Sequence, residues 1–199
     1  MGNERFTPEE LRNGIDALLV KGDARAQYVR GTYILTQGEE CGYDEARKLS
    51  EGRAWLEKSA LQGYVDAQYN LGNSFDTGSE ADPHERAEGL KWTRLAAMQG
   101  HREAQYNLAW ALLGTPENEE GCGWLLSAAN QGCEKSAQIL EDPDVQYNIG
   151  CYASRNGRLD TAEEYLLKAI EGNPKLLQEA EKDADYANLR NSGCAIFTS

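Results

Sequence analysis

The chain has 199 residues, 40% of them hydrophobic, and its 20 basic and 33 acidic side chains give a net charge of −13. This charge argues against nucleic acid and anionic membrane surfaces as partners, because Lys and Arg supply most of the attraction to both. No segment approaches the roughly 20 consecutive apolar residues that span a bilayer, so we do not expect membrane insertion.

The spacing of apolar residues predicts an all-α chain. No segment alternates apolar and polar residues for long enough to indicate a strand. In chain order, the expected helices cover residues 8–21, 23–37, 44–62, 65–77, 84–99, 102–113, 117–131, 134–140, 144–156, 159–171, 175–182 and 183–191.

One motif returns in the second, fourth, sixth and ninth of these helices. It reads Ala-Gln-Tyr at 26–28, 67–69 and 104–106, and Val-Gln-Tyr at 145–147. The four tyrosines follow one another at intervals of 41, 37 and 41 residues. A period in this range indicates a solenoid, in which small units bury their apolar faces only against their neighbours.

A second motif marks the third, fifth, seventh and tenth helices. An aromatic residue is followed one turn later by two small or apolar residues, and eight positions later by Gly or Asn. The aromatic residues are Trp55, Trp92, Trp124 and Tyr165, and the last residues are Gly63, Gly100, Gly132 and Asn173. Residues four and five apart share one helical face, while Gly or Asn suits a left-handed C-cap. The repeating unit is therefore helix, turn, helix.

The five prolines support this division. Each follows a residue whose short polar side chain can cap a helix, and proline is well tolerated at the first helical position. The pairs are Thr7-Pro8, Asp82-Pro83, Thr115-Pro116, Asp142-Pro143 and Asn173-Pro174. They predict five helix starts, and Thr7 with Glu10 also makes a capping box.

The two motifs together resemble the Sel1-like repeats, a subclass of the tetratricopeptide superfamily, over about residues 22–172. The positions that carry the resemblance are Ala67, Leu71, Gly72, Trp92, Ala96, Ala97 and Gly100. The resemblance implies an α/α solenoid, a right-handed superhelix of helix-turn-helix repeats.

Some positions depart from the family pattern. Arg30 stands where a leucine is expected, and Gly52, Gly89 and Gly121 stand where the family prefers alanine. Residues 136–140 look like a truncated helix before the next repeat. These departures affect the regularity of the repeats rather than the fold.

We expect a single solenoid domain over residues 1–199. It comprises an N-terminal capping helix (1–22), about four repeats (23–172), C-terminal capping helices (173–191) and a tail (192–199). A polar capping end is what an exposed solenoid terminus needs. The tail is expected to be either frayed or docked on the domain. Alternatively, Ile196 and Phe197 could occupy the groove of a neighbouring molecule.

The residues that usually carry chemistry do not form a recognisable site. The two histidines, His84 and His101, fall in a helix start and after a C-cap glycine, so we expect both to be solvated turn residues. Runs of glutamate such as 117–120 are typical first-turn charges that complement a helix dipole. We therefore expect no catalytic residues, no cofactor and no metal.

The five cysteines do not form a pattern of pairs. They are Cys41, Cys122, Cys133, Cys151 and Cys194. Secreted members of the family that the chain resembles bridge each helix pair through cysteines at constant repeat positions, which these cysteines do not occupy. The apolar run at residues 17–20 is too short for a secretory signal and follows acidic rather than basic residues. Together with the free thiols, this predicts a cytoplasmic protein.

The resemblance also implies where a partner binds. In that family the first helix of each repeat lines the concave face, with contact positions just before the Leu-Gly pair and one turn after it. The corresponding residues here are Tyr28, Asp66, Tyr69, Asn73, Asp76, Glu103, Tyr106, Trp110, Asp144 and Tyr147, with Thr32 and Cys151 at two further positions. They describe a groove lined by tyrosines and carboxylates.

Two interpretations of the repeated tyrosines stay open at this level. Tyrosine is enriched at interfaces because it offers a large contact area with a polar end and few rotamers to freeze. The same side chains could instead pack between neighbouring helices. Asn73, Asp76 and Trp110 break the repeat, so stacking geometry does not demand them, and Trp110 is the sharpest candidate for a partner contact.

These features predict a non-catalytic scaffold that binds a protein or an extended peptide in an acidic, tyrosine-lined groove. Negative charge would attract a partner with a basic patch and steer its approach. One alternative, by analogy with Sel1-like proteins in bacterial gene neighbourhoods, is an inhibitor or immunity-type protein that blocks one basic partner. A hydrolase is a further alternative, but no nucleophile–base arrangement supports it.

Overall fold

The computed structural model describes residues 15–75, 82–113, 115 and 117–197, apart from the side chain of Cys41. In these residues the chain is all-α and contains no strand, which confirms the predicted fold class. None of the described helices is long and apolar enough to cross a membrane. The chain divides into two compact units, Met1–His101 and Arg102–Ser199, and each is described by itself. The single domain over residues 1–199 stays a prediction.

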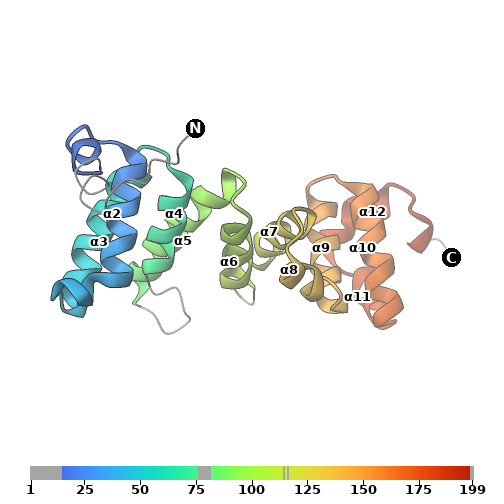
Figure 1. The fold of residues 1–199 in the computed structure, drawn as a ribbon. Helices are drawn as coiled ribbons and strands as arrows, with labels where there is room; N and C mark the ends of the chain where they lie inside the picture. The colour runs from blue at the N-terminus through green and yellow to red at the C-terminus, as the bar shows by residue number, and fades with distance from the viewer. Residues whose placement is uncertain (1–14, 76–81, 114, 116, 198–199) are drawn as a thin grey trace, which may run out of the picture. The chain divides into compact units, whose positions relative to one another are not determined.

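Unit 1 contains two helix-turn-helix repeats (Figure 1). Residues 15–20 are helical and lead into α2 (Ala24–Gln37), which is followed by a short 3-10 turn, η1 (Gly38–Cys41). The remaining helices are α3 (Glu45–Ala60), α4 (Val65–Ser74) and α5 (Pro83–Met98). Helix α2 packs along α3, α4 along α5, and α3 joins the two pairs by packing on α4.

Unit 2 contains two more repeats and a C-terminal cap (Figure 1). Its repeats are α6 (Arg102–Leu112) with α7 (Asn118–Asn130), and α9 (Pro143–Arg155) with α10 (Leu159–Gly172). The six-residue α8 (Glu134–Ile139) lies between them, as the truncated pattern over 136–140 predicts. The cap consists of α11 (Leu176–Ala180), η2 (Ala184–Tyr186), α12 (Ala187–Asn191) and η3 (Ala195–Phe197).

The small residues of the two motifs form the core. Ala67 of α4 and the pair Ala96 and Ala97 of α5 are buried, and Leu71 lies beside them. Small side chains let the helix backbones approach closely, and each buried leucine adds roughly 1.5–3 kcal/mol of hydrophobic stabilisation. The repeat pattern therefore marks the interior of the array.

Two of the five predicted proline starts are confirmed. Asp82 caps α5, because its Oδ1 accepts hydrogen bonds from the backbone N–H of His84 (2.9 Å) and Glu85 (3.3 Å). Asp142 caps α9 in the same way, and in both helices proline is the first residue. Thr7-Pro8 and Pro116 lie outside the described residues.

At the fifth pair, Asn173-Pro174, a helix follows close to the expected 175–182, but proline is not its first residue and Asn173 is not a left-handed C-cap. Helix α11 begins at Leu176, after a turn in which Asn173 Oδ1 accepts a hydrogen bond from the Lys175 N–H. Gly63, Gly100 and Gly132 do adopt the predicted left-handed conformation, with φ of +84°, +87° and +81°. Asn173 instead has φ −143°, because the ring of the following proline pushes the preceding residue into extended backbone.

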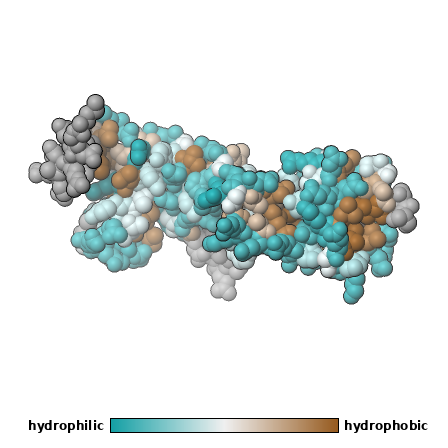
Figure 2. Space-filling model, turned by 45° about the vertical axis from the view of Figure 1, so that its right-hand side comes forward, coloured by the Kyte–Doolittle hydropathy of each residue, from teal (hydrophilic) through white to brown (hydrophobic). Residues whose placement is uncertain are grey.

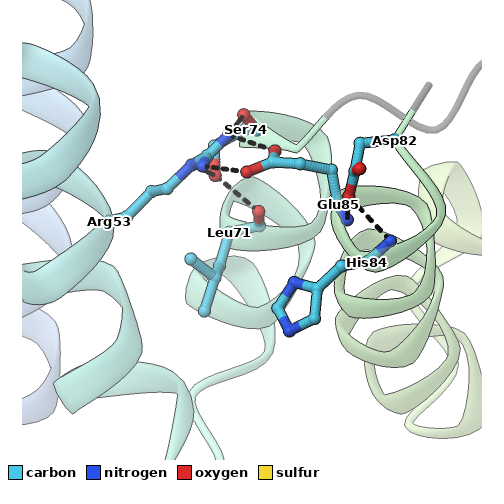
Figure 3. Close-up of polar contacts among 6 residues, drawn as sticks. All are labelled: Arg53, Leu71, Ser74, Asp82, His84 and Glu85. Atoms are coloured by element: carbon cyan, nitrogen blue, oxygen red, sulfur yellow. Dashed lines mark hydrogen bonds and ion pairs between the residues drawn. The ribbon is translucent and has the colours of Figure 1, made fainter. Parts of the chain in front are cut away.

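An arginine fastens the two repeats of unit 1 together (Figure 3). The Arg53 guanidinium of α3 pairs with both carboxylate oxygens of Glu85 at 3.1 and 3.0 Å. It also donates to the carbonyl and the hydroxyl of Ser74, at the end of α4, and lies 4.0 Å from the centre of the Phe75 ring. One side chain thus holds the end of α4 against the start of α5.

The C-terminal segment closes unit 2. Tyr186 is completely buried, and its hydroxyl donates a 2.8 Å hydrogen bond to the carbonyl of Tyr147 in α9. Arg190 donates to the carbonyls of Ala180 and Asp183, and the Phe197 ring lies 6.4 Å from that of Tyr186. The tail was expected to be either frayed or docked on the domain. Residues 194–197 are docked on unit 2. An exchange of Ile196 and Phe197 with a neighbouring molecule stays a prediction.

We expect Gly72→Ala to lower the free energy of unfolding by about 1–3 kcal/mol, because the new methyl would overpack the α4–α5 contact. A Cβ on Gly72 would lie 2.9 Å from the backbone N of Thr93 and 3.1 Å from the carbonyl O of Gly89. Urea denaturation monitored by circular dichroism measures the change. The exposed neighbour Asn73→Ala should stay within about 0.5 kcal/mol. Equal stability of the two variants would show that α4 and α5 do not meet at Gly72.

Candidate partner-binding surface

The predicted contact positions lie on one face of each first helix. On α4 these are Asp66, Tyr69 and Asn73, and on α6 they are Glu103, Tyr106 and Trp110. Intervals of three and four residues bring side chains onto a common helical face. Asp66, Asn73, Glu103 and Trp110 are exposed, whereas Tyr69 and Tyr106 are half-buried. Asp76 lies outside the described residues.

On α2 and α4 a polar bridge connects two repeats. Tyr28 is half-buried, with its ring 5.1 Å from that of Tyr64. The Asn70 amide donates weakly to the hydroxyls of Tyr28 (3.4 Å) and Thr32 (3.3 Å). Tyr28 and Thr32 therefore serve the packing of α2 on α4 while part of each remains accessible.

The α4 face includes a histidine that the sequence analysis placed in solvent. The His101 side chain is only 15% exposed, so the expected solvated turn residue is wrong. Its ring stacks on Tyr69 with centroids 4.3 Å apart, and its Nε2 lies 3.7 Å from Oδ1 of Asp66. The stack buries the imidazole that a turn position alone would leave open.

A regularity in the sequence could have located this histidine. Tyr64 and His101 both come directly after a left-handed C-cap glycine, and both pack on the tyrosine of the preceding first helix. The glycine reverses the chain so that the next residue points back onto that ring. In these two repeats the residue after the C-cap glycine is thus part of the tyrosine-bearing face.

On α6 the exposed aromatic residue is Trp110, which is 64% exposed. Tyr106, one turn before it, has the Lys135 ammonium 5.8 Å from its ring centre. Glu103 is exposed and pairs with Arg102 at 2.6 Å. This face therefore joins an open indole with charges of both signs and is not uniformly acidic. Figure 2 shows a largely hydrophilic surface that is interrupted by several hydrophobic patches.

On α9 the structure corrects the expected accessibility of Tyr147. Its side chain is only 9% exposed, its ring packs 5.2 Å from that of Tyr186, and its hydroxyl donates to Asp183 Oδ2 at 2.9 Å. Cys151 is buried beside it, whereas Asp144 stays exposed in the first turn. Tyr147 is buried because the C-terminal cap covers this face of α9. Of the two interpretations of the repeated tyrosines, packing between helices is therefore the one that applies to Tyr147.

A cluster of polar atoms forms beneath that cap. The ligand-type atoms of Cys151, Asp183 and Asp185 lie within 4.8 Å of one another. Burial, reinforced by Asp183, raises the pKa of the Cys151 thiol, so the thiol keeps its proton and can donate it to Asp183 (3.7 Å). Metal binding requires the thiolate, and Asp183 also accepts from the Tyr147 hydroxyl and the Asp185 N–H. The arrangement is that of a hydrogen-bonded cluster.

The cysteines differ sharply in environment. The four with described side chains are free thiols. Burial, with a smaller contribution from Glu119, raises the pKa of the Cys122 thiol to about 12. Burial also acts to raise the pKa of Cys133, but polar contacts with Ser136 and Lys135 and the charge of Arg102 outweigh it and lower that pKa. Cys133 is therefore the described thiol best suited to ionise.

We expect Cys133 to react fastest with a disulfide reagent such as DTNB, because only the thiolate attacks and Cys133 is half-buried rather than buried. The assay uses a Cys41→Ser background, so that Cys41 does not contribute. Cys133→Ser should then remove the fast phase, and Cys194→Ser should leave it unchanged. A fast phase that survives in the Cys133 variant would assign the reactive thiol elsewhere.

The two tyrosine environments can be separated by removing single hydroxyls. Tyr147→Phe should cost about 1 kcal/mol of unfolding free energy, because it deletes a hydrogen bond beneath the cap. Tyr106→Phe, at the same repeat position, should be nearly neutral, because its hydroxyl has no hydrogen bond within the described part of the chain. Thermal unfolding compares the two. A larger loss for Tyr106 would contradict the assignment of Tyr147 to the core.

Comparison with known proteins agrees with the repeat structure. A family model described as Sel1 repeat matches residues 24–64, 65–101, 102–133 and 143–174, more than half of the chain. Each matched segment contains one helix pair, and the residues between the last two matches contain α8. No curated protein matches the chain.

Two solved structures are similar to the chain. A Sel1 repeat protein from Oxalobacter formigenes is 24% identical over 84% of this chain and 62% of that one, with a TM-score of 0.46. The protein c5321, a protective antigen present in uropathogenic Escherichia coli strains and displaying an SLR fold, is 23% identical over 91% of this chain and 41% of its own, with a TM-score of 0.48. The chain thus spans less than two thirds of the length of either.

Proposed function

The chain belongs to the Sel1 repeat family, and on this premise we propose that it is a scaffold that binds another protein or an extended peptide on the first-helix faces of its repeats. Sel1 repeats generally bind proteins, and the family is generally non-catalytic. Trp110 is the observation that carries the proposal. A tryptophan that is 64% exposed and absent from the equivalent positions of the other repeats has no packing role that would explain it.

The proposed contact on α6 has the composition of a binding hot spot. Trp and Tyr are enriched at such spots because they bury much surface at a small cost in conformational entropy. Tyr106 lies one turn from Trp110 and is half-buried, so its ring is partly ordered before a partner binds. A partner that covers Trp110 would contact the exposed part of this ring as well. Burying Trp110 against a partner would remove an exposed apolar side chain from water.

Charge supports a partner with a basic patch. The chain carries a net charge of −13, and exposed carboxylates at Asp66, Glu103 and Asp144 occupy the first turns of α4, α6 and α9. Opposite charge accelerates association and makes it sensitive to salt. The Lys135 ammonium lies near the Tyr106 ring, so the proposal places the partner's basic side chains at the helix N-termini rather than at the aromatic pair.

The cap over α9 restricts the proposed surface. With Tyr147 buried, the open candidates are the faces of α2 and α4 in unit 1 and of α6 in unit 2. We extend the proposal to a reducing, cytoplasmic setting, which the free thiols support. An inhibitor of one basic partner differs from a general scaffold in affinity, because it would form a single tight, salt-sensitive complex.

Trp110→Ala should weaken partner binding by roughly 30-fold or more, the effect of losing about 2 kcal/mol at a hot spot. The wild type and the variant would be used to retain partners from native lysate, followed by titration of any protein lost with the variant. Leu167→Ala is the control, because Leu167 is an exposed apolar residue of α10 in the same unit. Circular dichroism checks the fold of both variants.

The same titration tests the remaining parts of the proposal. A basic partner should bind more weakly as ionic strength rises, whereas an uncharged one should not. Equal retention by wild type and Trp110→Ala would remove α6 from the binding surface. Loss of binding with Leu167→Ala instead would place the contact on the second-helix side of unit 2.

A further inference from the structure

Unit 2 contains a pocket that includes none of the predicted first-helix contact positions. It lies among α7, α9 and the start of α10 and has a volume of about 290 Å³. Ligand pockets range from roughly 300 to 1,000 Å³, so this one is large enough for a ligand with a single ring. The lining residues that bear on its chemistry are Trp124, Tyr152, Leu126, Ile149, Arg158 and Thr161.

Two aromatic rings line the pocket, and the fold restrains both of them. Nε1 of Trp124 in α7 donates a 3.0 Å hydrogen bond to Oε1 of Glu120, one turn earlier on the same helix. Tyr152 of α9 packs beside Gly123 of α7. Because aromatic rings pack favourably on one another, such a lining favours a flat, apolar ligand. The apolar side chains that complete this part of the lining are Leu126 and Ile149.

The place of the Tyr152 ring depends on a residue that breaks the repeat. A Cβ on Gly123 would lie 3.1 Å from two carbon atoms of this ring, so the glycine makes room for it. Pairing of helices does not require a glycine here, because the other repeats have side chains at the same place, directly before the motif aromatic. The residues there are Ala54, Lys91 and Glu164.

Arg158 supplies positive charge to the pocket. It is the exposed residue directly before α10, and its guanidinium has no ion-pair or hydrogen-bond partner within the described part of the chain. The hydroxyl of Thr161 likewise has no hydrogen bond to any described residue. Side chains three residues apart are neighbours at the start of a helix, so both groups can contact one ligand. A guanidinium binds a carboxylate through two parallel hydrogen bonds.

We propose that this pocket binds a small aromatic carboxylate. The ring of the ligand packs against Trp124 and Tyr152, and its carboxylate binds Arg158 and the Thr161 hydroxyl. Glu120 orients the indole and takes no part in ligand binding. Because it carries a like charge, the proposal places the ligand's carboxylate at the residues of α10 rather than beside α7.

A ring with a carboxylate can come from two sources, a free aromatic acid or the C-terminal aromatic residue of a polypeptide. The small volume of the pocket favours the free acid, because a chain end also brings its backbone atoms. The pocket contains none of the residues of the proposed partner surface on α6, so either proposal can fail without the other.

The binding experiment follows the indole N–H of Trp124 by NMR in the full chain, with the signal assigned from Trp124→Phe. The probe is 3-phenylpropionate, compared with 3-phenylpropionamide, which lacks the charge, and 3-cyclohexylpropionate, which lacks the aromatic ring. We expect a saturable shift with 3-phenylpropionate, about tenfold weaker binding of the amide and about threefold weaker binding of the cyclohexyl acid. No saturable shift with 3-phenylpropionate up to about 10 mM would overturn the proposal.

A fourth probe separates the two sources. N-acetyl-L-phenylalanine has the same ring and carboxylate together with the amide of a chain end. Weaker binding than that of 3-phenylpropionate supports a free acid as the ligand. Tighter binding would assign the pocket to the C-terminus of a polypeptide and overturn the choice of the free acid.

Two variants test the roles of the side chains. Arg158→Gln should abolish the preference for the acid over the amide and retain the preference for phenyl over cyclohexyl. Tyr152→Leu should show the opposite pattern, with its fold checked by circular dichroism. Lys175→Gln removes an exposed cation of unit 2 outside the pocket and should change neither preference. If Arg158→Gln weakens the acid and the amide equally, the guanidinium does not bind the carboxylate and the proposal is wrong.

Discussion

The close approach of the two helices within each repeat is the constraint on which the structure depends. In unit 1 a Cβ on Gly31 would lie 3.0 Å from the carbonyl of Gly52, and a Cβ on Gly72 would lie 3.1 Å from that of Gly89. In unit 2 the same relation holds between Gly121 and the carbonyl of Ala109, also at 3.1 Å. Of the glycines that stand where the family prefers alanine, this contact explains Gly121, because backbone meets backbone there. A Cβ on Gly52 would instead lie 2.6 Å from the Leu35 side chain.

The last repeat meets the same constraint differently. The space beside Gly150 of α9 is taken by the hydroxyl of Tyr186 from the C-terminal cap. The cap thereby gains a buried anchor, and the Tyr147 face is closed to outside partners. The apolar face of a terminal repeat must be covered, because no further repeat packs on it. Here the Tyr186 side chain, which packs beside Gly150, covers it.

Close pairing of helices also determines which surfaces remain for binding. Small residues occupy the contact between paired helices, so the larger residues of the first helices lie on the outer face. Trp110 is one of these residues and is 64% exposed. On the second-helix side of unit 2, Gly123 leaves room for the Tyr152 ring, and Glu120 and Arg158 are among the residues that line the adjoining pocket. The exposed Trp110 and the pocket beside Gly123 lie on different helices of unit 2, α6 and α7.

The all-α fold, the helix-turn-helix period and most helix ends can be predicted from the amino-acid sequence alone. Those features depend on interactions within one or two turns, such as the Asp82 cap on α5 and the positive φ of Gly100. The predicted left-handed cap at Asn173 is wrong for an equally local reason, because the ring of Pro174 forces the preceding residue into extended backbone. The burial of Tyr147, the stacking of His101 on Tyr69 and the pocket beside Gly123 depend on how distant segments pack together. These outcomes join segments about 30 residues apart, and no local pattern states which side chain will cover which face.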